Sequence, residues 1–301
     1  MNEEIRRSRQ QVSRRRALSL GGSVTLGGLL AACSDTGGGG SAAASSTSSS
    51  GSSSSPSSAS TSSSATSASP AASSLVALLD RANTCTMAKE ETQGPYWFDV
   101  DSIRTDIREN RPGTTLRLAV RVHDMSACSA GGAPTPVPNS VVEIWHCDAG
   151  GVYSGFESAS TGGTGGLPQG GQGNSGETSD GSYSLGDDEA TTTDDGTYLR
   201  GAQVADSRGI AQFTTIYPGW YRGRTAHIHL KVHVDKRTVL TSQLYMDEAL
   251  NEAVYATSPY DERTGRDTTN DTDNIFDESG LLTVQKESNG YLGVINLGVN
   301  V

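Results

Sequence analysis

The stretch that decides the fold is AHIHLKVHV, residues 226–234. Apolar residues occupy every second position, and His227, His229, Lys231 and His233 stand between them. Because successive side chains of a β-strand point to opposite faces, this alternation is typical of a strand with one buried face. Residues two apart lie about 6.6 Å from each other on the same face. His227 and His229 can therefore reach one metal ion, although an exposed pair of strand histidines would have the same spacing.

The same period of two recurs along the chain, with clusters of Gly, Asn, Asp and Pro between the segments. Four further segments are expected to be strands: 116–123, 140–146, 239–245 and 290–297. Only 75–81 and 247–254 suggest helix. Many short strands with little helix predict an all-β domain, folded as a β-sandwich.

The N-terminal residues 1–33 combine a basic head with an apolar, Gly-rich run that ends at Cys33. This order predicts an export signal. The run contains too few strongly apolar residues to span a membrane as a helix. The arginines at 14–16 resemble a twin-arginine signal. Leu30 to Cys33 reads LAAC, which resembles a lipobox, so we expect a lipid anchor on Cys33; ordinary signal-peptidase cleavage is the alternative. The chain is thus expected to be a cell-surface or periplasmic lipoprotein, or secreted.

Residues 34–74 are almost entirely Ser, Ala, Gly, Thr and Pro. Such a composition cannot bury enough apolar surface to offset the entropy of ordering, so we expect a flexible linker. The remaining residues, 75–301, are long enough for one large β domain. Within it, 158–193 is rich in Gly, Ser, Thr and Asp, and a loop of this length is expected to border a functional site.

The charge of the chain is acidic. Without residues 1–32, which hold six Arg and two Glu, the 23 basic and 34 acidic residues become 17 and 32, a net charge of about −15. Such a domain is a poor nucleic-acid binder, so no nucleic-acid partner is expected.

Three cysteines follow the linker: Cys85, Cys128 and Cys147. An exported chain is expected to form one disulfide among them and to leave one thiol over. Zinc ligation is the rival interpretation, but spacings of 43 and 19 residues contain no C-x-x-C pair.

Two segments upstream of the histidines each join a strand to a glycine turn and a tyrosine. Residues 142–154 read VEIWHCDAGGVYS and end near Tyr153, and residues 214–224 read TTIYPGWYRGR and contain Tyr221. Tyr221 lies only six positions before His227, so its phenol can be placed beside the imidazoles. Either tyrosine alone would more often be core packing.

Taken together, these segments resemble the intradiol ring-cleavage dioxygenases, the family of catechol and protocatechuate dioxygenases, and especially its secreted bacterial members. The resemblance includes ETQGPY at 91–96, IWHCDAGGVYSGF at 144–156, FTTIYPGWYRGRTAHIHLKV at 213–232 and QLY at 243–245. It extends from Glu91 to about Asn274 and implies a prealbumin/transthyretin-like β-sandwich.

The resemblance also implies a site. Tyr153, Tyr221, His227 and His229 fall on the four positions that hold the family's iron, and phenolates with imidazoles suit Fe(III) better than zinc or copper. The implied catalytic residues are Tyr221, Arg224 and Gln243: the first leaves the metal and takes up catechol protons, the second stabilises negative charge, and the third holds the arginine. His123, His146 and His233 have no ligand role in the family and are expected to be structural or exposed.

The implied partners are a catechol-type substrate and O₂, and the implied product is of the cis,cis-muconate type. A homodimer is expected because the family commonly dimerises. Trp97, Trp220, Tyr96 and Ile216 are expected to line an aromatic pocket. Two rivals stay open at this point: a cell-surface binding or adhesion sandwich without catalysis, and a copper oxidase built on the H-x-H pair.

Overall fold

The computed structural model describes residues 70–82, 86–126, 128, 133–160 and 189–301. The predicted export signal, Cys33, most of the predicted linker, Cys85 and the central part of the 158–193 loop lie outside these residues.

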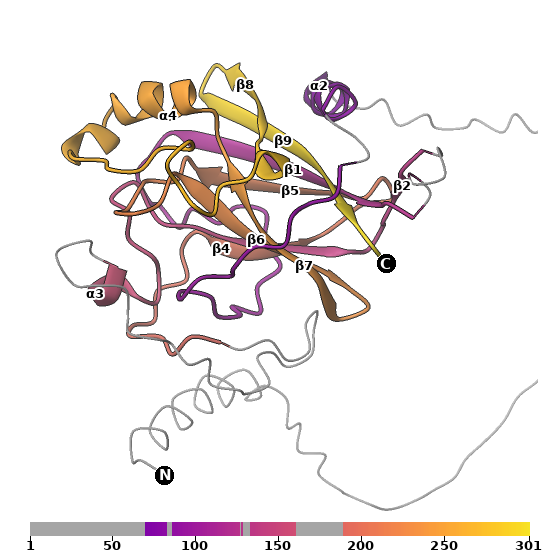
Figure 1. Ribbon diagram of the computed structural model, residues 1–301, viewed down its shortest axis with the longest axis horizontal. Helices are drawn as coiled ribbons and strands as arrows, with labels where there is room; N and C mark the ends of the chain where they lie inside the picture. The colour runs from indigo at the N-terminus through magenta and orange to yellow at the C-terminus, as the bar shows by residue number, and fades with distance from the viewer. Residues whose placement is uncertain (1–69, 83–85, 127, 129–132, 161–188) are drawn as a thin grey trace, which may run out of the picture. The chain divides into compact units, whose positions relative to one another are not determined.

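Two β-sheets form the framework of the described chain (Figure 1). The first sheet contains β1 (Thr115–Asp124), β2 (Thr135–Pro136), β5 (Ile210–Ile216), β8 (Thr283–Glu287) and β9 (Gly290–Val299). Its order is β2-β1-β9-β8, with β5 paired to β1, and β1 and β9 run parallel. The second sheet contains β3 (Val141–Trp145), β4 (Arg200–Val204), β6 (His227–Val234) and β7 (Arg237–Tyr245). Its order is β4-β3-β6-β7, with all neighbours antiparallel.

The hydrophobic core contains side chains from both sheets. Leu118 and Val120 of β1 belong to the same buried cluster as Ile228 and Leu230 of β6. These residues are the apolar members of the alternating patterns, which point to one face of each strand. The prediction of a strand-rich, all-β domain is therefore confirmed, while the specific prealbumin-like topology stays a prediction.

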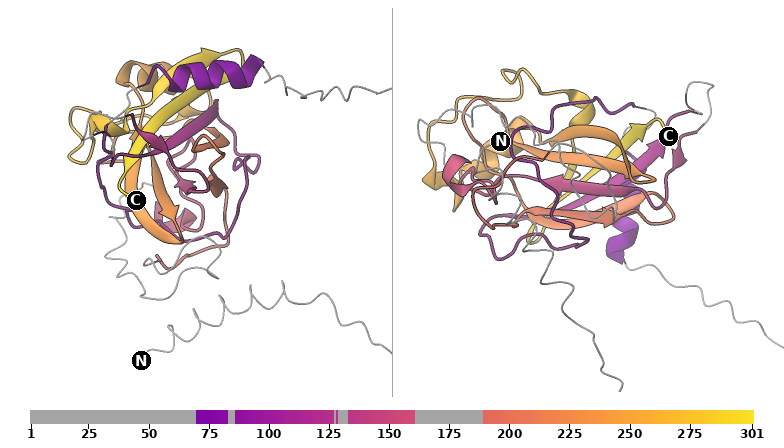
Figure 2. Two further views of the ribbon diagram at one scale, coloured as in Figure 1. Left: turned by 90° about the vertical axis from the view of Figure 1, so that its right-hand side faces the viewer. Right: turned by 90° about the horizontal axis from the view of Figure 1, so that it is seen from below.

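The outer face of the first sheet is covered by the helix α2 (Pro70–Leu79) (Figure 2). Leu75 and Leu79 pack in one apolar cluster with Ala119 and Leu292. The helix end is fixed by Asn296, whose Nδ2 donates to the carbonyl of Leu79 at 2.9 Å. The predicted helix at 75–81 therefore exists and begins earlier, at Pro70, within the segment predicted as linker. It also means that the expectation of only one buried face on β1 is wrong.

The outer face of the second sheet is covered by an extended segment that begins near Met87. Glu91 N donates to the Thr241 carbonyl at 2.8 Å, and the Lys231 Nζ lies 3.4 Å from the centroid of the Trp97 ring. As a result His227, His229, Lys231 and His233 are all buried, with no more than 2 % of any of them exposed. The expectation that β6 has one buried face is therefore wrong as well.

The remaining helices are short. They are α3 (Glu157–Ser160), α4 (Glu248–Tyr255) and the 3-10 turns η2 (Tyr260–Glu262) and η3 (Glu278–Gly280). The predicted helix at 247–254 is α4, which begins where it does because the Asp247 carboxylate accepts from Ala249 N, an N-cap.

Two cysteines lie in the described residues. Cys128 is disulfide-bonded, and Cys147 is a free, buried thiol. This agrees with one disulfide and one thiol left over. Among the helices of the described residues, none is long and apolar enough to cross a membrane.

Candidate metal centre

The outer face of the second sheet gathers the predicted residues by strand register. Trp145 on β3 pairs with His229 on β6, which pairs with Gln243 on β7, and His227 pairs with Tyr245. Side chains at paired positions point to the same face. A row of aromatic and polar side chains therefore crosses three strands beneath the covering segment.

Tyr153 reaches this face through the turn that follows β3. The Asp148 carboxylate accepts from Gly150 N and Val152 N at 2.9 and 3.0 Å, which closes the turn. Tyr153 N donates to Ser160 Oγ at 2.9 Å, and the phenol ring is fully buried. Tyr96 of the covering segment stacks on it, with ring centroids 4.7 Å apart.

Tyr221 arrives from the other side, after β5 and the Pro218-Gly219 turn. Gly219 N donates to the Asp148 carbonyl at 3.1 Å, so the two tyrosine-bearing turns touch. A Cβ on Gly219 would lie 2.3 Å from that carbonyl oxygen, and only glycine permits the approach. Tyr221 stays partly exposed, unlike Tyr153.

Four donor atoms converge between these elements. His227 Nε2 lies 3.4 Å from Tyr153 Oη, 3.1 Å from Tyr221 Oη and 3.1 Å from His229 Nε2. Ligand bonds of about 2.0–2.2 Å place neighbouring ligand atoms about 3 Å apart. The spacing therefore matches the first shell of a single metal ion.

The two imidazoles are oriented in different ways. His227 Nδ1 lies 2.7 Å from the Thr225 carbonyl, so it carries the proton and leaves Nε2 as the donor toward the site. His229 stacks on Trp145, with ring centroids 5.0 Å apart and planes within 4°. Gly94, at φ +70°, lies against its edge, where a Cβ would come within 3.1 Å of Cε1. Among the described residues, His229 Nδ1 has no hydrogen-bond partner.

The protonation states fit ligands for a cation. Burial, together with the charge of Arg224, lowers the pKa of His227 to about 3, and burial lowers the pKa of His229 well below its ordinary value. Both imidazoles are therefore neutral donors at physiological pH. Burial raises the pKa of Tyr153 and Tyr221, so a phenolate at either position requires a positive charge nearby.

A hard cation of high charge suits this donor set. Within the described part of the chain, no group of three or more His, Cys, Asp and Glu side chains is arranged to hold a metal ion. The candidate site therefore depends on its two phenols. Anionic phenolate oxygens with borderline imidazoles favour a trivalent ion over zinc or calcium.

Arg224 lies beside the donors and is held at two nitrogens. Nη2 donates to Gln243 Oε1 at 2.6 Å, and Nε donates to Asp273 Oδ2 at 2.9 Å. Gln243 is fixed in turn, because its Nε2 donates to the Thr92 carbonyl at 3.0 Å. The expected contact between Gln243 and Arg224 is thus present in the structure.

Sequence reasoning missed three elements of this arrangement. Asp273 lies 49 residues after Arg224 in an irregular segment, and no local pattern signals it. Tyr245 Oη donates to Glu91 Oε2 at 2.7 Å and ties β7 to the covering segment. Trp145 could have been found, because a large aromatic at an outward position of a strand indicates that something covers that face.

The aromatic residues expected to line a pocket divide between two settings. Tyr96 lies at the site, against Tyr153. Trp97 packs instead on Lys231 and donates from Nε1 to Glu143 at 3.0 Å, and Ile216 is buried beside Tyr198. Trp97 nevertheless shares one buried cluster with Tyr96 and Tyr153, and Trp220 is buried against Arg263, with its ring centroid 4.4 Å from the guanidinium carbon. The expected pocket lining stays a prediction for Trp97, Trp220 and Ile216.

The other three histidines are buried and structural. His146 Nε2 lies 2.7 Å from Thr215 Oγ1, and burial lowers its pKa to about 4. His233 Nε2 lies 3.3 Å from Glu143 Oε2. His123 is 4 % exposed on the outer side of β1.

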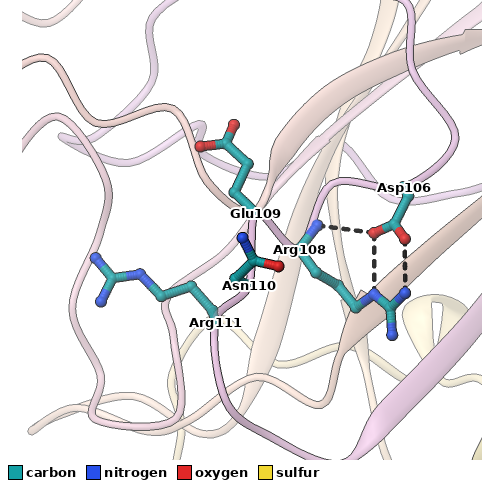
Figure 3. A pocket seen from close by; sticks show the side chains of 5 residues that line it. All are labelled: Asp106, Arg108, Glu109, Asn110 and Arg111. Carbon is teal, nitrogen blue, oxygen red and sulfur yellow. Dashed lines mark hydrogen bonds and ion pairs between the residues drawn. The ribbon is translucent and has the colours of Figure 1, made fainter.

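A separate pocket of about 510 Å³ is lined by Asp106, Arg108, Glu109, Asn110 and Arg111 (Figure 3). It shares no residue with the candidate ligands. Its charges are already paired, since Arg108 Nε and Nη2 donate to Asp106 at 2.9 and 2.6 Å and Arg111 pairs with Glu157. We therefore assign no ligand to it.

Comparison with solved structures identifies the fold. An intradiol ring-cleavage dioxygenase from Tetranychus urticae has 27 % identity and a TM-score of 0.58, over 72 % of this chain and 95 % of that chain. The dioxygenase domain of a dioxygenase and carbohydrate-binding fusion from a Streptomyces species has 25 % identity and a TM-score of 0.46, over 72 % and 99 %. A hydroxyquinol 1,2-dioxygenase from Pseudomonas putida has 14 % identity and a TM-score of 0.46, over 75 % and 71 %. No family model and no curated protein sequence matches the chain.

The fold and the site together define the class of protein: two β-sheets, with tyrosine and histidine donors that converge on the outer face of one of them. The likeness to the Tetranychus enzyme then confirms the resemblance, read from the motifs, to the intradiol ring-cleavage dioxygenase family. It does not favour the alternative of a binding module without catalysis.

Proposed function

We propose that this chain binds Fe(III) through Tyr153, Tyr221, His227 and His229 and cleaves a catechol-type ring between its two hydroxyls with O₂. The observation that carries the proposal is the convergence of these four donors at about 3 Å, beside an arginine, in a fold of the intradiol type. A catecholate would chelate ferric iron held by these residues, and the iron would make the ring reactive toward O₂. Without a metal this reaction is slow, because singlet organic molecules and triplet O₂ cannot combine in one spin-allowed step.

The two phenols differ in burial, and this supports different roles. Tyr153 is fully buried, and Ser160 and Tyr96 fix its backbone and ring, so it is suited to remain a ligand. Tyr221 is partly exposed and follows a turn. It is the phenol that can move away when substrate arrives, and its Oη would then take up a catechol proton.

Arg224 supplies a fixed positive charge. Its guanidinium is bound by Gln243 and Asp273 before substrate binds, so little reorganisation is required when negative charge develops on the ring oxygens. A lysine would lack the two simultaneous planar contacts.

The experiment that tests this function is an oxygen-uptake screen of the purified protein against a panel of catechols. We expect about one iron per chain, a broad visible band from phenolate-to-iron charge transfer, and a product of the cis,cis-muconate type that absorbs in the ultraviolet. A yellow semialdehyde product would indicate cleavage outside the two hydroxyls, and a colourless protein without iron would rule the enzyme out.

Export by a twin-arginine-type signal, a lipid anchor on Cys33 and a homodimer remain proposals. The anchor has a direct test, since Cys33→Ser should release the protein from the membrane fraction without changing its iron content.

A further inference from the structure

A buried carboxylate outside the predicted donor set contacts two parts of the site. Asp273 has a side chain with 0 % exposure. Its Oδ2 accepts from Arg224 Nε at 2.9 Å and from Thr225 N at 2.8 Å, while Oδ1 accepts from Ile275 N at 2.8 Å. Three N–H groups therefore determine the position of one carboxylate.

The backbone of Thr225 extends this contact to a candidate ligand. Its N–H is bound by Asp273, and its carbonyl accepts from His227 Nδ1 at 2.7 Å. The Thr225 side chain is held as well, because Oγ1 donates to Asn270 Oδ1 at 2.6 Å. A hydrogen bond to the outer nitrogen of a ligand histidine sets its tautomer and orientation. The carboxylate therefore acts on the position of His227 through the backbone of one residue, whose N–H and carbonyl belong to two successive peptide groups.

The Arg224 contact is complementary to that of Gln243. Asp273 accepts from Nε and Gln243 accepts from Nη2, so the plane of the guanidinium is fixed. Neither of these two residues binds Nη1. Burial by itself would lower the pKa of Arg224, but Tyr221 and Asp273 raise it overall. The contribution of Asp273 is therefore to orient the cation and to balance its charge.

We propose that Asp273 is a positioning residue that fixes the Arg224 guanidinium directly and the His227 imidazole through the backbone of Thr225. The inference rests on the proposed function: its arginine part on the proposed ring cleavage, and its histidine part on the proposed iron site. A carboxylate that merely anchored its loop would affect stability and would leave turnover and metal retention unchanged.

The test is Asp273→Asn in the iron-loaded enzyme. Either orientation of the amide places its NH₂ against an N–H donor, because both carboxylate oxygens accept hydrogen bonds. Removing such a partner of a metal ligand typically costs about 10- to 100-fold in metal affinity or activity. We expect release of iron to a chelator about 10-fold faster, turnover at least about 10-fold slower, and catechol affinity within about 3-fold by spectral titration. Asp271→Asn, on the exposed side of the same segment, is the matched control and should change none of these.

A second pair of variants separates the effect of Asp273 on Arg224 from its effect on His227. Arg224→Gln with Asp273→Asn removes both charges, so it leaves no unpaired buried charge and folds even if Asp273→Asn alone does not. Compared with Arg224→Gln, the double variant should release iron about 10-fold faster and show no further loss of turnover. Iron release equal to the parent in both backgrounds, with unchanged turnover, would overturn the proposal. If wild type binds iron but turns over no catechol, the proposed function fails while the iron-release arm still decides the role of Asp273.

Discussion

The two sheets share one core, and their outer faces differ. The outer face of the first sheet is covered by α2 through an apolar cluster of leucines and alanine. The outer face of the second sheet is equally buried, yet it carries Glu143, His227, His229, Lys231 and Gln243. The first outer face also buries Arg121, His123 and Asn296, but it buries fewer polar groups than the second. Burial of polar groups costs free energy unless they are bonded, so this cost is larger on the second face.

This difference separates packing from function. An apolar cover is explained by stability alone. A buried face with two neutral imidazoles beside a doubly bonded arginine is typical of a site whose groups act on something that binds between them. The following changes test the contrast by altering one face at a time.

The largest effect is expected from the ligand histidines. His229→Ala removes one of four protein donors, so bound iron, visible colour and catechol turnover should all be lost, and His227→Ala should behave in the same way. Metal analysis of the purified variants is the measurement. The matched control is His123→Ala, a buried histidine on the outer side of β1, which should retain iron and colour. Full iron content in His229→Ala would contradict the proposed ligand set.

A smaller effect on the protein is expected when the Arg224 guanidinium is removed and the four metal donors are kept. Arg224→Ala should keep iron and colour, bind catechol with its spectral shift, and turn over about 10²- to 10³-fold more slowly. Single-turnover kinetics separate this loss from binding. Arg222→Ala, on an exposed neighbour of Arg224, is the control. Near-normal turnover in Arg224→Ala would show that the arginine takes no part in the chemistry.

The sequence predicts the strands and the paired histidines because both follow from local rules. A period of two gives the faces of β1 and β6, and the spacing of His227 and His229 places them together. The tyrosines are placed by glycine turns whose close contact no single segment reveals. Their convergence was predictable only through the family resemblance.

What the sequence does not predict is how each outer face is covered. An alternating strand indicates one buried face, whereas the second face depends on distant segments such as α2 or the residues around Glu91. Asp273 and the Glu91 contact with Tyr245 belong to the same category, since both join segments 49 or more residues apart. Such contacts are set by tertiary packing, which leaves no local period.

The cover of the first sheet should affect stability alone. Leu79→Ala removes a buried side chain from the α2 cluster, and we expect a loss of about 2 kcal/mol in the free energy of unfolding, since a helix on a surface can partly close the gap. Iron content and turnover per folded molecule should stay unchanged. Denaturant unfolding and metal analysis on the same preparation measure both. A change in the visible band would mean that the two faces are coupled.

The smallest effect concerns the link between the second sheet and its cover. Burial raises the pKa of Glu91, and the hydrogen bond from Tyr245 opposes that rise. A carboxyl whose pKa is higher in the folded state binds more protons there, so its contribution to stability falls as pH rises from its ordinary value, 4.5, through the folded value. Tyr245→Phe removes the opposing bond and should raise the folded pKa of Glu91 further.

The cost of Tyr245→Phe should therefore depend on pH. We expect a loss of about 1 kcal/mol in the free energy of unfolding at neutral pH, where the carboxylate is charged and only partly buried, and a smaller loss near pH 4. Urea unfolding of wild type and variant at both pH values gives the difference directly. Tyr291→Phe on β9 of the first sheet is the control, because the described structure shows no carboxylate bonded to its hydroxyl, and its cost should not vary with pH. A cost for Tyr245→Phe that is equal at both pH values would mean that the bond to Glu91 does not oppose the burial of its charge, and that the cover is held by its backbone contacts instead.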